Sequence, residues 1–517
     1  MRGGKNNMAT SRKSPILIKE SELAAPLGQA KLAFGREICG SLDIAEQREW
    51  LVTNGIGGFA SGTVSGNLTR RYHGLLIAAL HPPVGRTQLV AKLDETVHYV
   101  GIEYALATNR WLSGAVEPKG YLNIESFRLE GITPIWQFAL GEALVEKRIW
   151  MSQGENTTYV QYTLLRGGQP LELKLKALVN YRDFHSSTHA GDWQMKVEPV
   201  EKGVQINAFD GATPFYLLSA EAEFETRHEW HRACFLPQER YRGLDDHEDH
   251  LLAALFSTEL ALNQSVTLVF TTNADEQLDG SRAWAEHAAH ENKLFAKWAS
   301  HDAQAASSAP DWAKQLILAV DQFIVKRSLP EEADGRSIIA GYHWFGDWGR
   351  GTRIALPGFT LTTGRVDIAK KVLLAFSRYV DRGMLPNDFP DASGQPECNT
   401  VDAALWYFEA VRQYFAVTQD KATLVKLFPV PKEMTKAHLK GTRYQIHVDE
   451  LDGLLYAGEP GVQLTWVDAN VGDWVVTPRI GKPVEINTLW YNALETMAAL
   501  APEAGRPGEP FAKMRRW

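Results

Sequence analysis

The chain has 517 residues and a formal net charge of −8 at pH 7, and 44% of its residues are hydrophobic. This length predicts two or three domains with ordinary apolar cores. The acidic balance argues against a nucleic acid partner, which needs a basic face, and no apolar run approaches the ~18 residues of a membrane span.

The three cysteines, Cys39, Cys234 and Cys398, lie far apart in the sequence. They predict neither a disulfide framework nor a Cys-based zinc site, and they fit a reducing compartment. The first residues, MRGGKNNMATSRKSP, lack the apolar segment of a signal peptide. We therefore expect a cytoplasmic protein. The sequence shows no phosphate-binding motif and no sign of a cofactor or a metal.

Residues 1–30 read as a flexible tail, and residues 31–279 as an antiparallel β-sandwich. Short alternating segments separated by Gly, Pro, Asn and Asp predict this sandwich. They include VGRTQLVAKLDETVHYV, TTYVQYTLL, LELKLKALV, VQINAF, FYLLSA and SVTLVFTT. An Ala-rich helical linker is expected at residues 280–309.

Helical spacing dominates residues 310–517. The helical segments are DWAKQLILAVDQFIVKR, DIAKKVLLAFSRYV, VDAALWYFEAVRQYFAV, TKAHLKGTRYQIHV and PVEINTLWYNALETMAAL, and a further helix should begin at Gly351. Helical hairpins joined by polar loops predict an α/α toroid. A closed ring of about twelve helices needs well over ~300 residues, so we expect an incomplete barrel that lacks its last helices.

Two motifs suggest other functions, and we reject both. EWLVTNGIGGFASG has a G-x-G-x-x-A frame, but the next stretch is too rich in Gly and Thr for the helix of a dinucleotide site. A Gly-rich turn in a β domain is favoured there. Three H-x-x-H pairs, His228/His231, His247/His250 and His287/His290, have zinc-site spacing, but solvated polar residues are the favoured interpretation.

Four inter-helix loops concentrate acids, aromatics, Asn and Arg. Any single Asp in such loops is more often a helix cap or a turn residue, but four similar loops together match the needs of glycosidic bond cleavage. The residues are Asp347, Trp348 and Arg350; Asn387, Asp388 and Asp391; Asn399 and Asp402; and Trp466, Asp468, Asp473, Trp474, Arg479, Lys482 and Glu485.

The sequence resembles the archaeal and bacterial type of glycogen debranching enzyme, the amylo-α-1,6-glucosidase family. The resemblance rests on EWLVTNGIGGFASGTVSGNLTRRYHGLLIAAL in the N-terminal half. In the C-terminal half it rests on GDWGRGTRIALPGFTLTTGR, GMLPNDFPD, NTVDAALWYFEAV and LTWVDANVGDWVVTPRIGKPVEINTLWYNAL. It implies a β-sandwich followed by an (α/α)6 barrel of the six-hairpin glycosidase type. The implied activity is hydrolysis of α-1,6-linked glucose at branch points of glycogen-like glucans, with inversion.

The resemblance also implies roles for the loop residues. Asp468 falls on the family's general acid, and Arg350 on a residue that binds hydroxyls of the terminal glucose. The remaining substrate-binding candidates are Asp347, Trp348, Asn387, Asp402, Trp466, Asp473, Arg479 and Glu485.

The chain departs from the family pattern at several positions. Gly351 replaces an Asp, Arg353 replaces a large apolar residue, and Cys398 stands where a Tyr is usual. The family's segment that closes the barrel and carries the catalytic base has no counterpart here, so no base is assigned within residues 1–517. We expect weak or absent activity. A non-catalytic α-glucan-binding protein and a truncated pseudoenzyme are the alternatives.

Overall fold

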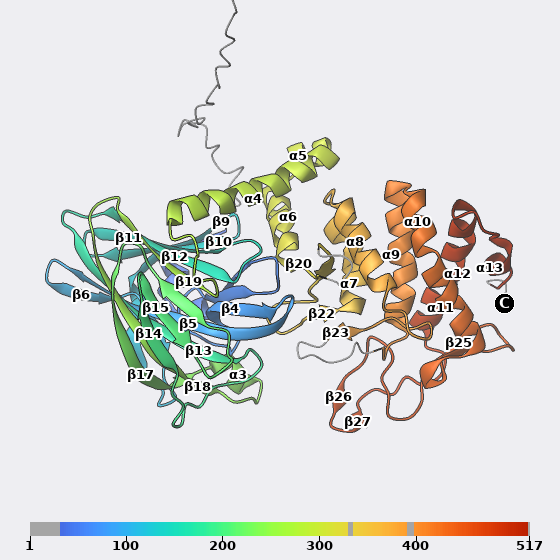
Figure 1. The fold of residues 1–517 in the computed structure, drawn as a ribbon, viewed down its shortest axis with the longest axis horizontal. Coiled ribbons are helices and arrows are strands. Elements are labelled where there is room, and N and C mark those ends of the chain that lie inside the picture. Colours follow the sequence, from blue (N-terminus) through green and yellow to red (C-terminus); the bar gives the residue numbers. More distant parts are fainter. Residues whose placement is uncertain (1–31, 329–333, 390–397, 515–517) are drawn as a thin grey trace, which may run out of the picture.

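The computed structural model describes residues 32–328, 334–389 and 398–514. The tail expected at residues 1–30 and the site candidate Asp391 lie outside these residues. An antiparallel β domain occupies the N-terminal half of the chain, and a row of helices occupies the C-terminal half (Figure 1). No helix in the described ranges has both the length and the apolar character that crossing a lipid bilayer requires.

The first large sheet has nine strands in the described part of the chain. In spatial order they are β1 (Ala33–Phe34), β9 (Ile124–Glu130), β10 (Thr133–Leu140), β11 (Ala143–Met151), β12 (Thr157–Arg166), β19 (Ser265–Thr271), β16 (Phe215–Leu218), β15 (Gly203–Asn207) and β14 (Lys196–Val200).

The second large sheet has eight strands among the same residues. Its order is β17 (Glu223–Phe235), β18 (His247–Leu260), β13 (Leu171–Asp183), β5 (Val84–Tyr99), β4 (Gly74–His81), β3 (Phe59–Thr63) and β2 (Glu49–Thr53), and β6 (Ile102–Ala105) pairs with β5. Strand β13 shows why the alternating segments form this sheet. Leu171, Leu173 and Leu175 are buried in the shared core, whereas Glu172 and Lys176 are exposed.

Short elements complete the β domain. They are β7 (Thr108–Arg110), β8 (Val116–Lys119), α1 (Arg36–Cys39), α2 (Leu42–Ala45) and α3 (Pro237–Tyr241). The Gly-rich turn expected from EWLVTNGIGGFASG is confirmed, because β2 and β3 form an antiparallel hairpin around it. Gly57 has φ +103°, and a Cβ at this position would lie 2.3 Å from the carbonyl oxygen of Pro83. Only glycine fits this close approach.

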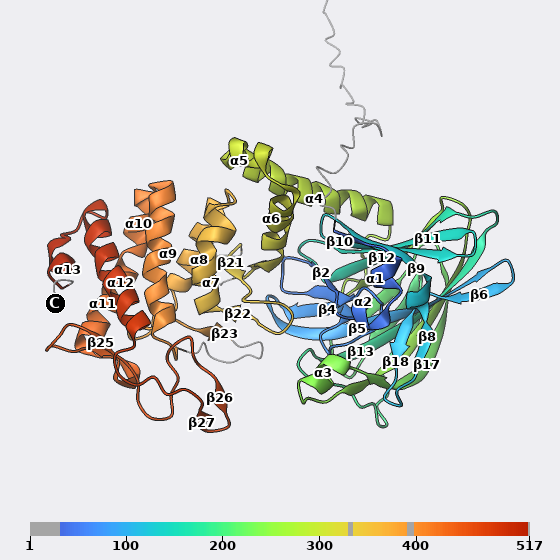
Figure 2. The same cartoon turned by 180° about the vertical axis from the view of Figure 1, so that it is seen from behind.

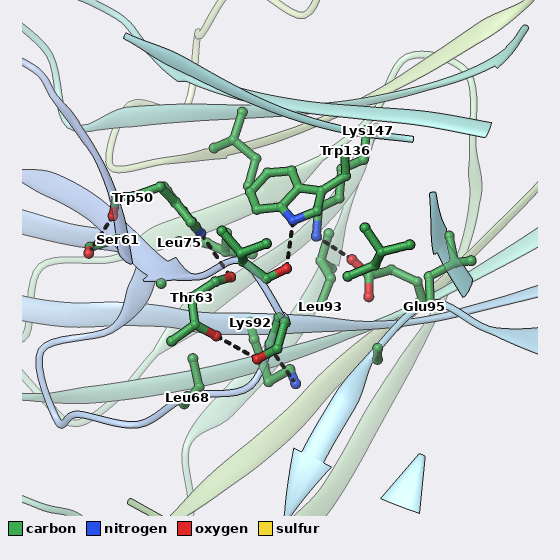
Figure 3. Close-up of a pocket in the computed structure, with 18 of the residues that line it drawn as sticks. Trp50, Ser61, Thr63, Leu68, Leu75, Lys92, Leu93, Glu95, Trp136 and Lys147 are labelled. Atoms are coloured by element: carbon green, nitrogen blue, oxygen red, sulfur yellow. Dashed lines mark hydrogen bonds and ion pairs between the residues drawn. The ribbon is translucent and has the colours of Figure 1, made fainter. Parts of the chain in front are cut away.

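A small cavity of about 40 Å³ lies inside the β domain (Figure 3). Trp50 and Trp136 line it, and their indole N–H groups donate to the carbonyl oxygens of Thr63 at 3.3 Å and Val64 at 2.9 Å. Lys147 pairs with Glu95 at the same cavity. Ligand pockets usually enclose ~300–1,000 Å³, so these two tryptophans belong to the core and not to a sugar site.

Helices follow the β domain in chain order. They are α4 (Gly280–His301), α5 (Ala303–Ser308), α6 (Asp311–Phe323), α7 (Gly349–Leu356), α8 (Val366–Ser377), α9 (Asp402–Thr418), α10 (Lys421–Leu427), α11 (Pro429–Lys440), α12 (Val484–Glu503) and α13 (Glu509–Met514). Figure 2 shows α4 running along the β domain while α8 to α13 stand beside it. Helix α9 packs against α7, α8 and α12 in a second apolar core.

Short two-stranded pairings join the loops between these helices. They are β20 (Ile324–Lys326) with β21 (Arg336–Ile338), β22 (Asp347–Trp348) with β23 (Asp388–Phe389), β24 (His447–Val448) with β25 (Leu455–Tyr456), and β26 (Asn470–Val471) with β27 (Trp474–Val475).

Three helix predictions need correction. The helix expected across DWAKQLILAVDQFIVKR ends at Phe323, and Ile324–Lys326 form the strand β20. The helix expected across TKAHLKGTRYQIHV ends at Lys440, because Gly441 adopts φ +92°, which breaks helical geometry. The chain then continues into β24. The helix expected to begin at Gly351 begins at Gly349 and is preceded by Trp348, which makes no side-chain cap. Gly351 therefore lies within the first turn.

The expectation of solvated histidine pairs is wrong for two of their members. His250 is fully buried in β18, and burial lowers the pKa of its imidazole. His287 is buried on α4, where its Nε2 lies 3.1 Å from the hydroxyl of Thr133. The charged sequence around His247 and His250 concealed a strand in which every residue from Glu248 to Ala254 is buried.

An aromatic cluster joins the β domain to the helical region. Phe59, Tyr72 and Phe184 of the β domain pack with Tyr342 and Trp344 from the segment before α7. The guanidinium groups of Arg70 and Arg242 lie 5.6 and 5.3 Å from the Trp344 ring centroid. Gln322 of α6 also donates to the carbonyl of Leu51 at 2.9 Å. These contacts fix the start of the helical region against the β domain.

Candidate functional site

The candidate site forms where the N-terminal ends of α7 and α9 meet the loop that precedes α12. Gly349 begins α7, and its N–H donates to the carbonyl of Asn387 at 2.7 Å. A Cβ at this position would lie 2.2 Å from the carbonyl oxygen of Pro386. The glycine thus allows α7 to start directly against the loop that carries Asn387, and the next residue is Arg350.

Arg350 is the centre of the site. Its Nε donates to both carboxylate oxygens of Asp402, at 3.1 and 3.0 Å, and its Nη1 donates to Asp468 at 2.8 Å. Its Nη2 reaches the hydroxyl of Thr400 at 3.2 Å and the carbonyl of Thr465 at 3.1 Å. One guanidinium therefore ties together three loops that are far apart in the sequence, as its planar set of donors permits.

Asp402 is a buried carboxylate, 2% exposed, at the first position of α9. The N–H of Ala403 donates to it at 2.8 Å, and the hydroxyl of Thr400 donates to the same oxygen. A carboxylate at a helix N-terminus is stabilised by the helix dipole. With Arg350 as counterion, Asp402 positions the guanidinium and is itself largely screened from solvent.

Asp468 is the accessible carboxylate of the site, since its side chain is 39% exposed. It lies in the loop between Thr465 and β26. Its ion pair with Arg350 connects it to Asp402 through a single side chain. Of the two carboxylates on Arg350, Asp468 is the one that a ligand from solvent can contact.

Three other predicted residues lie around the start of α7. The carboxylate of Asp347 is buried, and it accepts from the hydroxyl of Ser337 at 2.5 Å and from Arg327 at 2.6 Å. It therefore joins segments of the fold. Trp348 is half-buried in the β22–β23 pairing. Asn387 is 6% exposed, and its side-chain oxygen has no hydrogen-bond partner among the described residues.

The remaining candidates lie in the long loop before α12. Trp466 and Trp474 are both 62% exposed, and Asp473 is exposed beside Trp474 in the β26–β27 hairpin. Arg479 and Glu485 form a separate ion pair with a shortest contact of 2.5 Å. The structure therefore brings Arg350, Asp402 and Asp468 together and holds Arg479 and Glu485 as a second group.

Arg353 is a buried arginine next to the site. Its side chain is 1% exposed, and it donates to the carbonyls of Ala403 and Pro386, both at 3.1 Å. Its guanidinium lies 4.5 Å from the ring centroid of Phe376. Burial lowers the pKa of Arg353 to about 10. Where a large apolar residue is expected, this arginine joins the starts of α7 and α9 to the loop between α8 and α9.

Sequence reasoning missed the two threonines that contact Arg350. Thr400 lies two residues before Asp402 and could have been found as a hydroxyl beside a helix start. Thr465 contributes its backbone carbonyl, and backbone contacts of this kind leave no signal in side-chain identity.

A group of possible metal ligands, Glu49, His73 and His343, lies between the β domain and the helical region. The backbone N–H of Thr69 donates to Nδ1 of His73 at 3.1 Å, so a neutral His73 carries its proton on Nε2, which faces Glu49 at 3.4 Å. The hydroxyl of Ser61 donates to the carbonyl of Trp50 and accepts from Nε2 of His343. Nε2 of His73 faces Glu49 and Nε2 of His343 contacts Ser61, so the cluster is better explained as a structural network.

Comparisons with known proteins cover both halves of the chain. A family profile described as glycogen debranching enzyme N terminal matches residues 48–267, and one described as amylo-alpha-1,6-glucosidase matches residues 318–516. The glycogen debranching enzyme of Saccharomyces cerevisiae is 29% identical over an alignment that covers 30% of this chain and 13% of the yeast protein.

A solved structure of a bacterial glucoamylase complexed with acarbose resembles this chain in fold. Its TM-score is 0.50 at 10% sequence identity, over 91% of this chain and 65% of the glucoamylase. This chain thus covers less than two thirds of the length of the yeast enzyme and less than two thirds of the length of the glucoamylase. At this identity the glucoamylase supports the arrangement of a β domain followed by a helical region, and nothing further.

Proposed function

Because this chain belongs to the glycogen debranching enzyme family, we propose that it is a glycoside hydrolase of α-1,6-linked glucose at branch points of glycogen-like α-glucans. The observation that carries the proposal is the convergence of Arg350, Asp402 and Asp468 at the starts of α7 and α9. A guanidinium and an accessible carboxylate side by side are suited to binding sugar hydroxyls and transferring a proton.

The proposed architecture follows the same family. Residues 31–279 form a β-sandwich domain, residues 280–309 a helical linker, and residues 310–517 part of an α/α barrel of the six-hairpin glycosidase type. The order of the sheets and helices supports this division. In this proposal the Arg350 cluster belongs to the α/α barrel.

In the proposed mechanism Asp468 is the general acid. It protonates the glycosidic oxygen as the bond to the anomeric carbon breaks, and an activated water attacks the opposite face with inversion. Asp468 must first leave its ion pair with Arg350 and take up a proton from solvent, and its 39% exposure permits both. The base that activates the water is not assigned to a residue.

Arg350 has two roles in this mechanism. It binds hydroxyls of the terminal glucose, and its bond to the buried Asp402 holds its guanidinium in place while Asp468 is released to the substrate. Trp348, Trp466 and Trp474 supply aromatic faces for sugar rings. Asn387 supplies a buried amide oxygen that has no hydrogen-bond partner in the described part of the chain. Asp473, Arg479 and Glu485 complete the proposed substrate contacts.

Gly351 is proposed to impair this activity. The family pattern has an acid at this position, which would lie one residue after Arg350 and in the first turn of α7. Without it, one ligand for glucose hydroxyls is lost. The expected consequence is weaker substrate binding and slow turnover.

The proposal is tested by measuring glucose release from a branched limit dextrin by the full chain. We expect slow release that Asp468→Asn abolishes, and a matched Asp192→Asn variant in the exposed part of the β domain should leave it unchanged. Release that is equally fast in the Asp468→Asn variant and in the wild type would exclude Asp468 as the acid.

A second candidate is a non-catalytic α-glucan-binding protein. The exposed Trp466 and Trp474 favour it, because both rings are available for stacking and Gly351 removes an acid from the site. Calorimetric titration with maltooligosaccharides separates the two functions. Binding without any glucose release would favour the second candidate, and the absence of binding would exclude it.

A further inference from the structure

A pocket of about 410 Å³ lies between the β domain and the helical region, away from the Arg350 cluster. The β2–β3 turn and the Gln153–Gly154 turn form one side. Helices α4, α6 and α8 and the strands β20 and β21 form the other. Its lining residues are Gly55, Ile56, Gln153, Gly154, His290, Lys293, Leu294, Lys297, Asp321, Ile324, Lys326, Asp334, Arg336, Arg365 and Ile368.

The charge of this pocket is opposite to that of the chain. Among the described residues, its lining holds five lysine and arginine side chains and two aspartates, whereas the whole chain carries a net charge of −8. A local surplus of positive charge in a concave site between domains attracts anions.

Arg365 is the buried cation of the pocket. Its side chain is 3% exposed, its Nη1 donates to Asp321 at 2.7 Å and its Nε to the hydroxyl of Thr363 at 3.0 Å. Its Nη2 is buried and has no hydrogen-bond partner in the described structure. Burial lowers the pKa of Arg365, so Asp321 offsets the cost of burying this charge only in part. An anion in the pocket would add a further negative charge near this guanidinium.

The other cations differ in how far they are already paired. Lys297 binds Asp367 at 2.6 Å, and Arg336 binds Asp334 at 2.8 Å. Lys293 and Lys326 are exposed at the rim and make no ion pair with any described residue. These two lysines are the donors available to an incoming anion, and Arg365 adds a buried positive charge beside them.

We propose that this pocket binds a phosphorylated monosaccharide. The phosphate is held by the exposed ammonium groups of Lys293 and Lys326, and the positive charge of buried Arg365 favours an anion there. The volume exceeds what a bare phosphate fills. Ile56, Leu294 and Ile324 offer apolar contact to the C–H face of a sugar ring, and Gln153 and Asp321 offer hydrogen bonds to its hydroxyls.

The site lies where three parts of the fold meet. The N–H of Lys326 donates to the carbonyl of Gly55 at 2.8 Å, and His290 of α4 contacts Asp321 of α6 at 2.7 Å. A ligand held by Lys293 of α4 and Lys326 of β20, with Gln153 of the β domain, would link α4 to both halves of the chain. We therefore expect it to stabilise their arrangement, by mass action, in proportion to its occupancy.

The test is calorimetric titration of the full chain with glucose 6-phosphate, inorganic phosphate and glucose at constant ionic strength. We expect saturable binding of glucose 6-phosphate, and binding of phosphate and of glucose that is at least about fivefold weaker. The double variant Lys293→Ala/Lys326→Ala should weaken glucose 6-phosphate binding by about fivefold or more. Lys436→Ala on α11, an exposed lysine far from the pocket lining, should not change it.

Both variants replace exposed side chains, so loss of folding does not confuse the result. Equal binding of inorganic phosphate and glucose 6-phosphate would overturn the assignment of a sugar phosphate. No saturable heat with glucose 6-phosphate, or no difference between the double variant and wild type, would overturn the site itself. The readout is binding, so the outcome is independent of whether the chain hydrolyses glucan.

Discussion

Arg350 and Asp402 are joined through both carboxylate oxygens, and Asp402 is almost fully buried at the start of α9. Replacing Arg350 with Met leaves that carboxylate without its cation. We expect the free energy of unfolding to fall by about 1.5–3 kcal/mol, as measured by urea denaturation. The double variant Arg350→Met/Asp402→Asn should be destabilised as well. Its loss of unfolding free energy should be about 1 kcal/mol smaller than the sum of the losses in the two single variants.

The matched control is Arg506→Met, which replaces an exposed arginine in the turn after α12. A surface change of this kind should shift the unfolding free energy by no more than about 0.5 kcal/mol. Strict additivity of the Arg350 and Asp402 variants would show that the two side chains are not coupled in solution.

Asp468→Asn should lower kcat/KM for glucose release at least about 100-fold, because the amide cannot donate the acid's proton. The melting temperature should change little, since the side chain is 39% exposed. A loss confined to KM would instead assign Asp468 to substrate binding alone.

Gly351→Asp should tighten maltose binding by about threefold, because a carboxylate in the first turn of α7 would face sugar hydroxyls beside Arg350. The new Cβ would lie 3.2 Å from the Cβ of Ala340, so a small shift of that neighbour is required. We do not expect this change alone to restore ordinary turnover. Gly351→Ala adds the same Cβ without the acid and should not tighten binding. If both variants bind maltose equally well, the carboxylate has no part in recognition.

His343 should make the chain less stable as the pH is lowered. Burial, with a smaller effect of His73, lowers the pKa of His343 to about 3. Between about pH 6.5 and 3 the unfolded chain therefore binds a proton at this position that the folded chain does not. Unfolding is favoured by up to about 1.4 kcal/mol for each pH unit in that window.

Urea denaturation of wild type and His343→Gln between pH 4.5 and 6.5 isolates this histidine. Burial alone would raise the pKa of the neighbouring Glu49, but its contacts with His73 and Arg70 outweigh burial and lower that pKa to about 2. The folded-state titration of Glu49 therefore falls below the measured range. The variant should show a pH dependence smaller by about one proton. Parallel curves would mean that His343 does not titrate in this window.

The sequence was sufficient to predict strands and helices that depend on the local spacing of apolar residues. Strands such as β13 alternate buried leucines with exposed Glu172 and Lys176, and helices such as α9 and α12 repeat apolar residues at helical spacing. Where helices stop was harder to predict. Gly441 ended α11 because of a left-handed backbone angle that its neighbours do not signal.

The candidate site was predicted as a list of residues and not as an arrangement. The fold brings Arg350 within hydrogen-bond distance of Asp468, whereas Asp347 accepts hydrogen bonds from Ser337 and Arg327. The basic pocket could not be predicted from the sequence, because it too depends on which segments the fold brings together. Lys293, Lys326 and Arg365 come from three separate elements and form no motif.

The aromatic cluster around Trp344 decides where the chain can be divided. The proposed linker at residues 280–309 suggests a cut near residue 309, but Phe59, Tyr72 and Phe184 would then lose Tyr342 and Trp344. An isolated β domain would expose an apolar aromatic face flanked by Arg70 and Arg242. A fragment for expression of the β domain should therefore extend past Trp344, because Tyr342 and Trp344 pack against that domain.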